Sequence, residues 1–215
     1  MADEIVLSFQ DSLLRQSDLR LLEEGRWLND RLIGFMFDYF THHQFEKISQ
    51  DVLFISPDVT QFLKLAEGSV DIGDFIEPLN IPSHKLVFFA VNDNESTNSV
   101  GGSHWSLLLY KRQTNSFHHY DSSTPFNTSA ARSLAKNVEP FLLVKDTPSF
   151  IQDKCPQQQN GYDCGVYVIT ITEELCKNFL GNRDKALIDT MTVKDITQKR
   201  ELLKNLILNL SQEKT

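Results

Sequence analysis

The residues best suited to chemistry lie in segment 158–165, where one cysteine, Cys164, stands between an aspartate and a glycine. A polar turn precedes Cys164 and the apolar run 166–169 follows it, which predicts a junction between a loop and a helix. Unpaired backbone N–H groups and the positive end of a helix dipole favour a thiolate over a thiol at such a junction. Because the thiolate is the nucleophilic form, Cys164 is a candidate for covalent catalysis. The alternative is a small buried hydrophobic residue, as most free cysteines are.

A candidate base and a candidate acid come from two successive predicted strands. His104 begins the first strand, Asp121 ends the second, and the polar residues 111–114 between them have the length of a hairpin loop. A symmetric turn pairs Tyr110 with Asn115. The same register puts His104 directly opposite Asp121, where a carboxylate can hold an imidazole in one tautomer. A slip of one residue would undo this pairing, and His104 would then be a strand-end histidine bonded to solvent or backbone.

Acyl transfer also requires hydrogen-bond donors that face the developing oxyanion. The backbone N–H of Cys164 is one candidate, and the side-chain amide of Gln158, six residues upstream, is another. The neighbouring Gln157 and Gln159 cannot be separated from Gln158 by sequence. All three glutamines could also form nothing more than a solvated polar turn.

The remaining cysteines and histidines show no catalytic or metal-binding pattern. Cys155 and Cys176 lack the loop-to-helix context of Cys164, so we expect structural roles for them, and also for His118 and His119. Three cysteines and six histidines without regular spacing match neither a disulfide framework nor a zinc site. We therefore expect no metal and no other cofactor.

Hydrophobic patterning predicts an α+β domain, in which helices flank a central run of strands. Strand signals cover 85–92, 104–110 and 116–121. Helices are predicted for 27–40, opening near Asn29, and for a segment that Ser56 caps, in which Val59, Phe62 and Leu63 would face inward. A third helix would span 129–144 with an interruption at Pro140, and a fourth would span 163–179 and end at Gly181. The last predicted helix is 192–210, with Thr192 and Asp195 as a capping pair.

The composition indicates one globular domain, residues 1–215, with an acidic surface. Hydrophobic residues make up 40% of the chain, charged residues make up 23%, and the net charge is −8. This balance argues against nucleic-acid binding and suits a basic protein partner. The N-terminus lacks a secretory signal, and no apolar run approaches the ~18 residues of a membrane span. We expect an intracellular protein of the cytoplasm or nucleus, monomeric and without a membrane partner.

The candidate residues follow one another along the chain in the order histidine, aspartate, glutamine and cysteine. With Trp105 directly after His104, and with Trp-Leu-Asn-Asp at residues 27–30, this order resembles the Ulp/sentrin-specific cysteine proteases (peptidase clan CE, family C48). Papain has its cysteine first. The resemblance covers about residues 8–210, and no motif position departs from it. It implies a papain-like cysteine protease fold of the Ulp type, a central mixed sheet flanked by helices.

The resemblance also implies roles for the candidate catalytic residues. Cys164 would be the nucleophile, and His104 would be the general base and later the general acid. Asp121 would orient His104, and Gln158 would donate a hydrogen bond to the oxyanion.

The substrate-binding residues implied by the resemblance are Trp105, Trp27, Asp30 and Asn92. Trp105 would cover a narrow channel for the Gly-Gly tail of a ubiquitin-like modifier, and Trp27 and Asp30 would line that channel. The alternatives are a core aromatic for Trp105, and a hydrophobic staple and first-turn acid for Trp27 and Asp30. Asn92 opens a polar stretch, 92–100, that we expect to order over the modifier.

The function implied is a thiol protease that cleaves after the terminal Gly-Gly of the neddylation modifier. It would process the modifier's precursor and remove the modifier from cullins and other targets. Segments 7–18, 54–62 and 92–94 are similar to the deneddylating members of the family. The alternatives are a desumoylating protease, an acetyltransferase with the same triad, and a non-catalytic binder of ubiquitin-like proteins.

Overall fold

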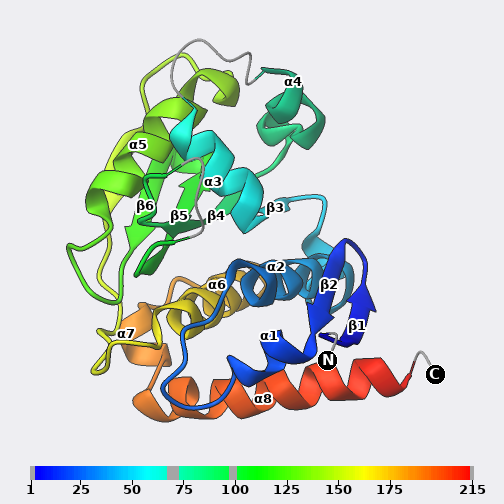
Figure 1. Ribbon diagram of the computed structural model, residues 1–215. Coiled ribbons are helices and arrows are strands. Elements are labelled where there is room, and N and C mark those ends of the chain that lie inside the picture. The colour runs from blue at the N-terminus through cyan, green and yellow to red at the C-terminus, as the bar shows by residue number, and fades with distance from the viewer. Residues whose placement is uncertain (1–2, 67–72, 97–100, 214–215) are drawn as a thin grey trace.

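A five-stranded mixed sheet crosses the middle of the molecule (Figure 1). The computed structural model describes residues 3–66, 73–96 and 101–213. In order across the sheet, the strands are β3 (Val52–Ile55), β4 (Leu86–Asn92), β5 (Trp105–Lys111), β6 (Ser116–Tyr120) and β7 (Ser149–Gln152). The β4–β5 and β5–β6 pairs are antiparallel, whereas the edge strands β3 and β7 run parallel to their neighbours.

Both faces of the sheet are buried, which explains the unbroken apolar run in β4. Phe88 and Ala90 belong to the hydrophobic core on one face, and Val87 and Phe89 belong to the core on the other. This alternation follows from the period of two along a strand. The three strands predicted from the sequence are all present, with ends within one residue of the prediction.

Helices cover both faces of the sheet, as predicted (Figure 1). α3 (Pro57–Leu65) and α5 (Thr128–Val138) pack on one face. α2 (Asp30–Tyr39) and α6 (Cys164–Leu180) pack on the other, and α8 (Val193–Gln212) packs against α6 on the side away from the sheet. The result is an α+β fold with a central mixed sheet.

The smaller elements connect or extend these layers. β1 (Ile5–Phe9) and β2 (Ser12–Arg15) form a separate antiparallel hairpin beside α2. Sequence patterning missed β1, β2, β3 and β7 because strands of four or five residues carry little periodicity. The other elements are α1 (Gln16–Arg20), α4 (Gly73–Ile76), α7 (Leu187–Thr190), a π-helical turn (Phe40–Gln44) and 3₁₀ turns (Glu46–Ile48, Glu77–Leu79, Ile81–Ser83, Arg112–Thr114 and Glu139–Leu142).

The helix starts and stops follow the predicted signals. The side chain of Asn29 accepts a hydrogen bond from the N–H of Leu32, which caps α2. Thr192 and Asp195 form a capping box at the start of α8, and Gly181 follows the last residue of α6. Within the described ranges, no helix has both the length and the apolar character needed to cross a membrane.

One predicted core residue is exposed. Ser56 caps α3 as expected, but Phe62 is 38% exposed and contacts the exposed Phe75 with tilted rings. Leu63 is buried as predicted, and Lys64 is buried beside it because its ammonium group reaches backbone carbonyls beside β4. Apolar periodicity does not predict a buried lysine on this helix.

The predicted β5–β6 register is wrong by two residues. Tyr110 pairs with Phe117 rather than with Asn115, and Lys111 pairs with Ser116. The 3₁₀ turn and the left-handed backbone of Asn115 (φ 46°) place four residues, 112–115, in the loop. A shift of two residues preserves the face to which each side chain points. His104 and Asp121 are therefore diagonal neighbours on the same face of the hairpin, and no longer directly opposite each other.

Candidate active site

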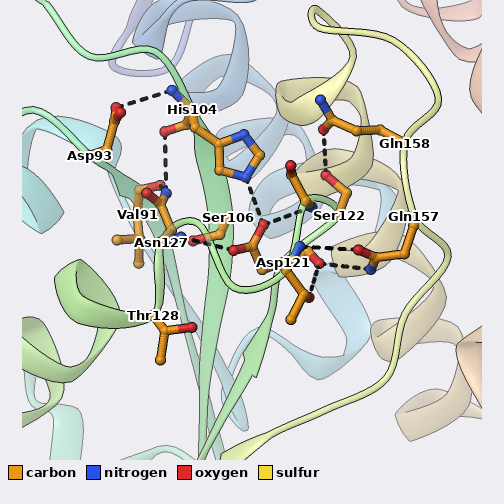
Figure 2. Close-up of polar contacts among 12 residues, drawn as sticks. Val91, Asp93, His104, Ser106, Asp121, Ser122, Asn127, Thr128, Gln157 and Gln158 are labelled. Atoms are coloured by element: carbon orange, nitrogen blue, oxygen red, sulfur yellow. Dashed lines mark hydrogen bonds and ion pairs between the residues drawn. The ribbon is translucent and has the colours of Figure 1, made fainter.

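His104 and Asp121 meet at the ends of β5 and β6 (Figure 2). His104 Nε2 donates a hydrogen bond to Asp121 Oδ1 at 2.7 Å, and the two residues are only 5% and 0% exposed. His104 directly precedes β5, and Asp121 directly follows β6. The structure therefore brings the predicted base and acid into direct contact.

The Asp121 carboxylate is fixed by more than the imidazole. The backbone N–H groups of Ser123 and Asn127 each donate to it at 2.9 Å (Figure 2). Burial disfavours the charged carboxylate, but these hydrogen bonds and His104 outweigh burial and lower the pKa of Asp121. Asp121 is thus an anion held in one orientation.

Cys164 is the first residue of α6 and is buried. Since Nε2 of His104 is bonded to Asp121, Nδ1 is the nitrogen left to interact with the neighbouring Cys164. Burial works against the imidazolium, but the interactions of His104 with Asp121 and Cys164 prevail and raise the pKa of His104 to about 9. A charged imidazolium beside a sulfur atom suits nucleophilic attack followed by protonation of a leaving group.

The structure separates the three glutamines. Gln158 accepts a hydrogen bond from Ser122 Oγ and donates from Nε2 to the carbonyl of Asn160, both at 2.8 Å, so it joins the Asp121 loop to the Cys164 loop. An amide nitrogen has two hydrogens, so Gln158 can still donate to an oxyanion. Gln157 instead donates to the Asp121 carbonyl at 2.9 Å, and Gln159 is exposed (Figure 2).

A pocket of about 670 Å³ opens in front of Cys164 and His104. All four predicted substrate-binding residues, Trp27, Asp30, Asn92 and Trp105, line it. The other lining residues are Leu28, Asn29, Pro57, Asp58, Gln61, Asn94, Ser96, Gly101, Gly102 and Ser103.

The two indoles are held by backbone acceptors. Trp27 Nε1 donates to the carbonyl of Gly161 at 2.7 Å, and Trp105 Nε1 donates to the carbonyl of Leu28 at 3.1 Å. Trp27 is 51% exposed, whereas Trp105 packs against the core of the α6 face. These bonds fix both rings in the lining of the pocket, where they would meet a bound ligand.

A second part of the pocket lining, beside Trp105, depends on a close approach between Asn92, the cross-strand partner of Trp105, and Gly102. A Cβ at Gly102 would lie 1.9 Å from Asn92 Oδ1, and its φ of +92° is unfavourable for other residues. Asn92 Oδ1 also accepts from the N–H of Asn94 at 2.9 Å. Of the predicted loop 92–100, residues 97–100 lie outside the described residues.

Two carboxylates make one part of the pocket acidic. Asp30, at the start of α2, and Asp58, at the start of α3, both line it. Burial and the neighbouring Asp30 raise the pKa of Asp58, and the charge of Arg31 opposes them. This wall suits a ligand segment that carries positive charge.

Several supporting residues had no signal in the sequence. Asp93 accepts from the N–H of His104 at 3.0 Å, and Asn127 donates to the His104 carbonyl at 3.2 Å (Figure 2). Lys64 donates to the carbonyls of Asn92 and Asn94. Acids and lysines in such positions are usually solvated, so only the fold shows what they contact.

The other histidines are bonded away from the pocket. His118 contacts Asp153 Oδ2 at 2.6 Å and Ser116 Oγ at 2.8 Å. These three residues resemble a serine-type triad, but Ser116 is buried, so its hydroxyl is not accessible to a substrate. His119 contacts Gln152 Oε1 at 2.8 Å and is buried. Cys155 and Cys176 are buried free thiols. No group of three or more potential metal ligands occurs in the part of the chain that the structure describes.

Comparison with known proteins agrees with this geometry. Residues 26–209 match the family described as "Ulp1 protease family, C-terminal catalytic domain". The chain belongs to this family. It is 48% identical to human "Sentrin-specific protease 8" over 98% of this chain and 100% of the relative. It is 35% identical to "NEDD8-specific protease 1" of Arabidopsis thaliana over 98% of this chain and 96% of the relative.

Solved structures show the same fold. The yeast Ulp1 protease domain in complex with Smt3, the yeast ortholog of SUMO, superimposes with a TM-score of 0.72. The alignment covers 98% of this chain and 90% of that one at 24% identity. The predicted Ulp-type fold is thereby confirmed.

Proposed function

We propose that this protein is a cysteine protease that cleaves after the C-terminal Gly-Gly of a NEDD8-type modifier. It processes the modifier's precursor and releases the modifier from lysines of cullins and other targets. The observation that carries this proposal is the pocket itself. Trp27, Asp30, Asn92 and Trp105 surround one opening at the buried nucleophile Cys164.

The geometry supports covalent acyl transfer in two steps. The Cys164 sulfur attacks the terminal glycine carbonyl, and His104 gives a proton to the departing amine, which leaves a thioester on Cys164. Water then attacks the thioester, His104 takes a proton from it, and the modifier leaves with a free carboxylate. The Cys164 N–H and a Gln158 N–H stabilise the oxyanion in both steps.

The pocket favours a tail without side chains. Trp105 is fixed by its hydrogen bond to Leu28, and its cross-strand partner Asn92 is crowded against Gly102. Glycine residues can pass such fixed and crowded residues because they lack a Cβ. The acidic pair Asp30 and Asp58 would meet a basic residue of the modifier farther from the scissile bond.

A NEDD8-type modifier is preferred over SUMO because of the similarity to the two named relatives. Sentrin-specific protease 8 and NEDD8-specific protease 1 match over nearly the whole chain. The structures of SUMO proteases that match share the fold at lower identity. We also propose that residues 1–215 form one catalytic domain, since the two cores share one sheet, and that this domain acts as a monomer.

Mass spectrometry of the cleavage products tests this function. The NEDD8 precursor and a cullin-linked conjugate should both yield NEDD8 that ends in Gly-Gly with a free carboxylate. Acetyl-CoA added with a protein substrate should produce no acetylated product, which would exclude the acetyltransferase alternative. Binding of NEDD8 without cleavage of either substrate would contradict the proposal. Analytical ultracentrifugation should show a monomer.

A further inference from the structure

Arg200, in the middle of α8, is a charged side chain that is only 8% exposed. Its guanidinium makes five hydrogen bonds, which matches its five N–H donors. The acceptors are Asp163 Oδ1 (2.9 Å from Nε), the carbonyls of Leu21 and Glu23 (2.9 and 3.3 Å from Nη1), and the carbonyls of Arg26 and Tyr162 (2.7 and 3.1 Å from Nη2).

Two of these acceptors belong to the two segments that border the active-site pocket. Arg26 directly precedes Trp27, and Tyr162 lies two residues before Cys164. A single nitrogen, Nη2 of Arg200, contacts both carbonyls. The guanidinium also lies over the Tyr162 ring, 5.5 Å from its centroid. Arg200 therefore joins the Trp27 wall to the loop that carries the nucleophile.

Two independent contacts join the same segments. The Trp27 indole donates to the carbonyl of Gly161, and Leu28 packs so closely on α6 that a Cβ at Gly165 would lie 2.9 Å from Leu28 Cβ. The wall and the nucleophile therefore meet at three points. Of these three contacts, only the one made by Arg200 comes from α8, which packs on the side of α6 that faces away from the sheet.

Asp163 has a different role from the one its sequence position predicts. A residue directly before a helix usually caps the helix through its side chain, but Asp163 makes no such bond. Its carboxylate instead pairs with Arg200 and accepts from Asn160 Nδ2 at 2.8 Å. Burying this ion pair is costly, and an apolar pair could fill the same volume at no loss of stability. If Arg200 serves to position the two segments, it is clear why its Nη1 and Nη2 groups donate to backbone carbonyls of those segments.

We propose that Arg200 is a positioning residue that sets the spacing between the Trp27 wall and Cys164. The proposal rests on the protease function proposed above. α6 is anchored by its own buried residues from Cys164 to Thr172, so the contact between Cys164 and His104 does not depend on Arg200. Loss of the guanidinium lets the wall move relative to the sulfur. Recognition of the modifier tail then suffers, while the reactivity of the thiol persists.

Arg200→Lys is the main test variant, because it keeps a positive charge near Asp163 but cannot reach five acceptors. Arg200→Ala is the second variant, and added guanidinium ion should partly restore its activity. Leu203→Ala is the matched control, since Leu203 is buried on the same helix and contacts neither loop through a polar group. It should lower the melting temperature without changing kcat or KM.

In Arg200→Lys, cleavage of the modifier should become slower, whereas alkylation of Cys164 should keep nearly its parent rate. With the modifier that the parent enzyme cleaves best, kcat/KM should fall by about tenfold to about a hundredfold, mainly through KM. Alkylation of Cys164 by iodoacetamide should change by less than about threefold. An unchanged kcat/KM, or alkylation that falls in parallel with it, would overturn the proposal. An equal fall of kcat/KM in Leu203→Ala, at an equal loss of stability, would also overturn the proposal.

A readout without substrate distinguishes failure of this proposal from failure of the proposed function. The chain has two tryptophans, so 5-fluorotryptophan labelling gives two fluorine resonances. Arg200→Lys should shift or broaden the Trp27 resonance more than the Trp105 resonance, because Trp105 bonds to Leu28 beside Trp27 but also packs against the core on the α6 face. If the parent enzyme cleaves no modifier, the function fails, but the Trp27 resonance still decides the role of Arg200. An unchanged Trp27 resonance would refute it.

Discussion

At the scale of single residues, the central feature is where the proton lies before reaction. His104 is held between a buried carboxylate and a sulfur atom, and both favour the imidazolium. Asp121 accepts two backbone N–H groups as well, so it remains an anion and does not take the proton. His104 is therefore charged at neutral pH and ready to protonate a leaving amine.

The first prediction at this scale concerns the nucleophile. Cys164→Ala should abolish cleavage of modifier substrates, because no other thiol borders the described pocket. Binding of the modifier should persist, since the walls of the pocket do not depend on the sulfur. Titration calorimetry and a cleavage assay measure the two effects. Cys155→Ala is the control and should retain turnover. Residual cleavage by Cys164→Ala would refute the assignment.

The second prediction concerns pH. The folded pKa of His104 is raised above its ordinary value of 6.5 to about 9, so the imidazolium is present below that pH and is lost as the pH rises through it. Hydrolysis of a C-terminal amide should therefore decline above about pH 9. Asp121→Asn removes a group that raises the pKa, so this decline should move to lower pH.

The matched control for the pH experiment is Asp153→Asn. It removes the carboxylate of the other histidine–aspartate pair, which lies away from the pocket. The decline at high pH should stay in place in this variant. If Asp121→Asn leaves the decline where it is, or moves it upward, His104 is not the group that titrates.

The third prediction concerns Gln158. Gln158→Ala should lower kcat by about 10²–10³, the usual effect of one oxyanion donor. Gln159→Ala should leave kcat nearly unchanged, since Gln159 is an exposed neighbour in the same turn. Equal effects of the two substitutions would indicate a polar turn with no part in catalysis.

At the scale of elements, helix caps and the His104–Asp121 contact were predictable, whereas the exact strand register and the contacts of buried charged residues were not. Asn29 and Thr192 cap helices where the sequence places them, because capping depends only on residues three positions away. The β5–β6 register was wrong by two, because a 3₁₀ turn with left-handed Asn115 replaced a symmetric turn. Lys64 and Arg200 gave no signal, since charged residues on helices usually face solvent.

The fourth prediction belongs to the contact between α6 and the segment before α2. Gly165→Ala would place a Cβ 2.9 Å from Leu28 Cβ, so the Trp27 wall or the start of α6 must shift. We expect kcat/KM to fall by about tenfold or more and the melting temperature to decrease. Gly34→Ala is the control, because its Cβ would meet only Pro57 Cδ at 3.5 Å. Full activity of Gly165→Ala would contradict this account of the wall.

At the scale of the whole molecule, the site is assembled from segments far apart in the chain. Cys164 begins the helix on one face of the sheet, whereas His104 and Asp121 lie at the ends of its strands. The order of motifs along the chain was sufficient to predict the fold family and the residues around the pocket. The sequence did not show how α8 contacts the active-site loops, because that contact spans 37 residues or more between partners.

Specificity also belongs to the whole molecule. In the proposed reaction the pocket receives the Gly-Gly tail, and the body of the modifier must be recognised by surface outside it. The net charge of −8 and the acidic pair at the pocket favour a partner with a basic face. Substrate choice therefore cannot be assigned to Cys164 or its immediate partners.

The most direct test of the central claim is a panel of modifiers that carry a C-terminal electrophile. NEDD8, SUMO and ubiquitin with a C-terminal vinyl sulfone are each incubated with the protein, and the adduct is mapped by mass spectrometry. We predict rapid formation of one NEDD8 adduct, on Cys164, with little labelling by the other two. Labelling by SUMO or ubiquitin in place of NEDD8, or an adduct on a cysteine other than Cys164, would contradict the account.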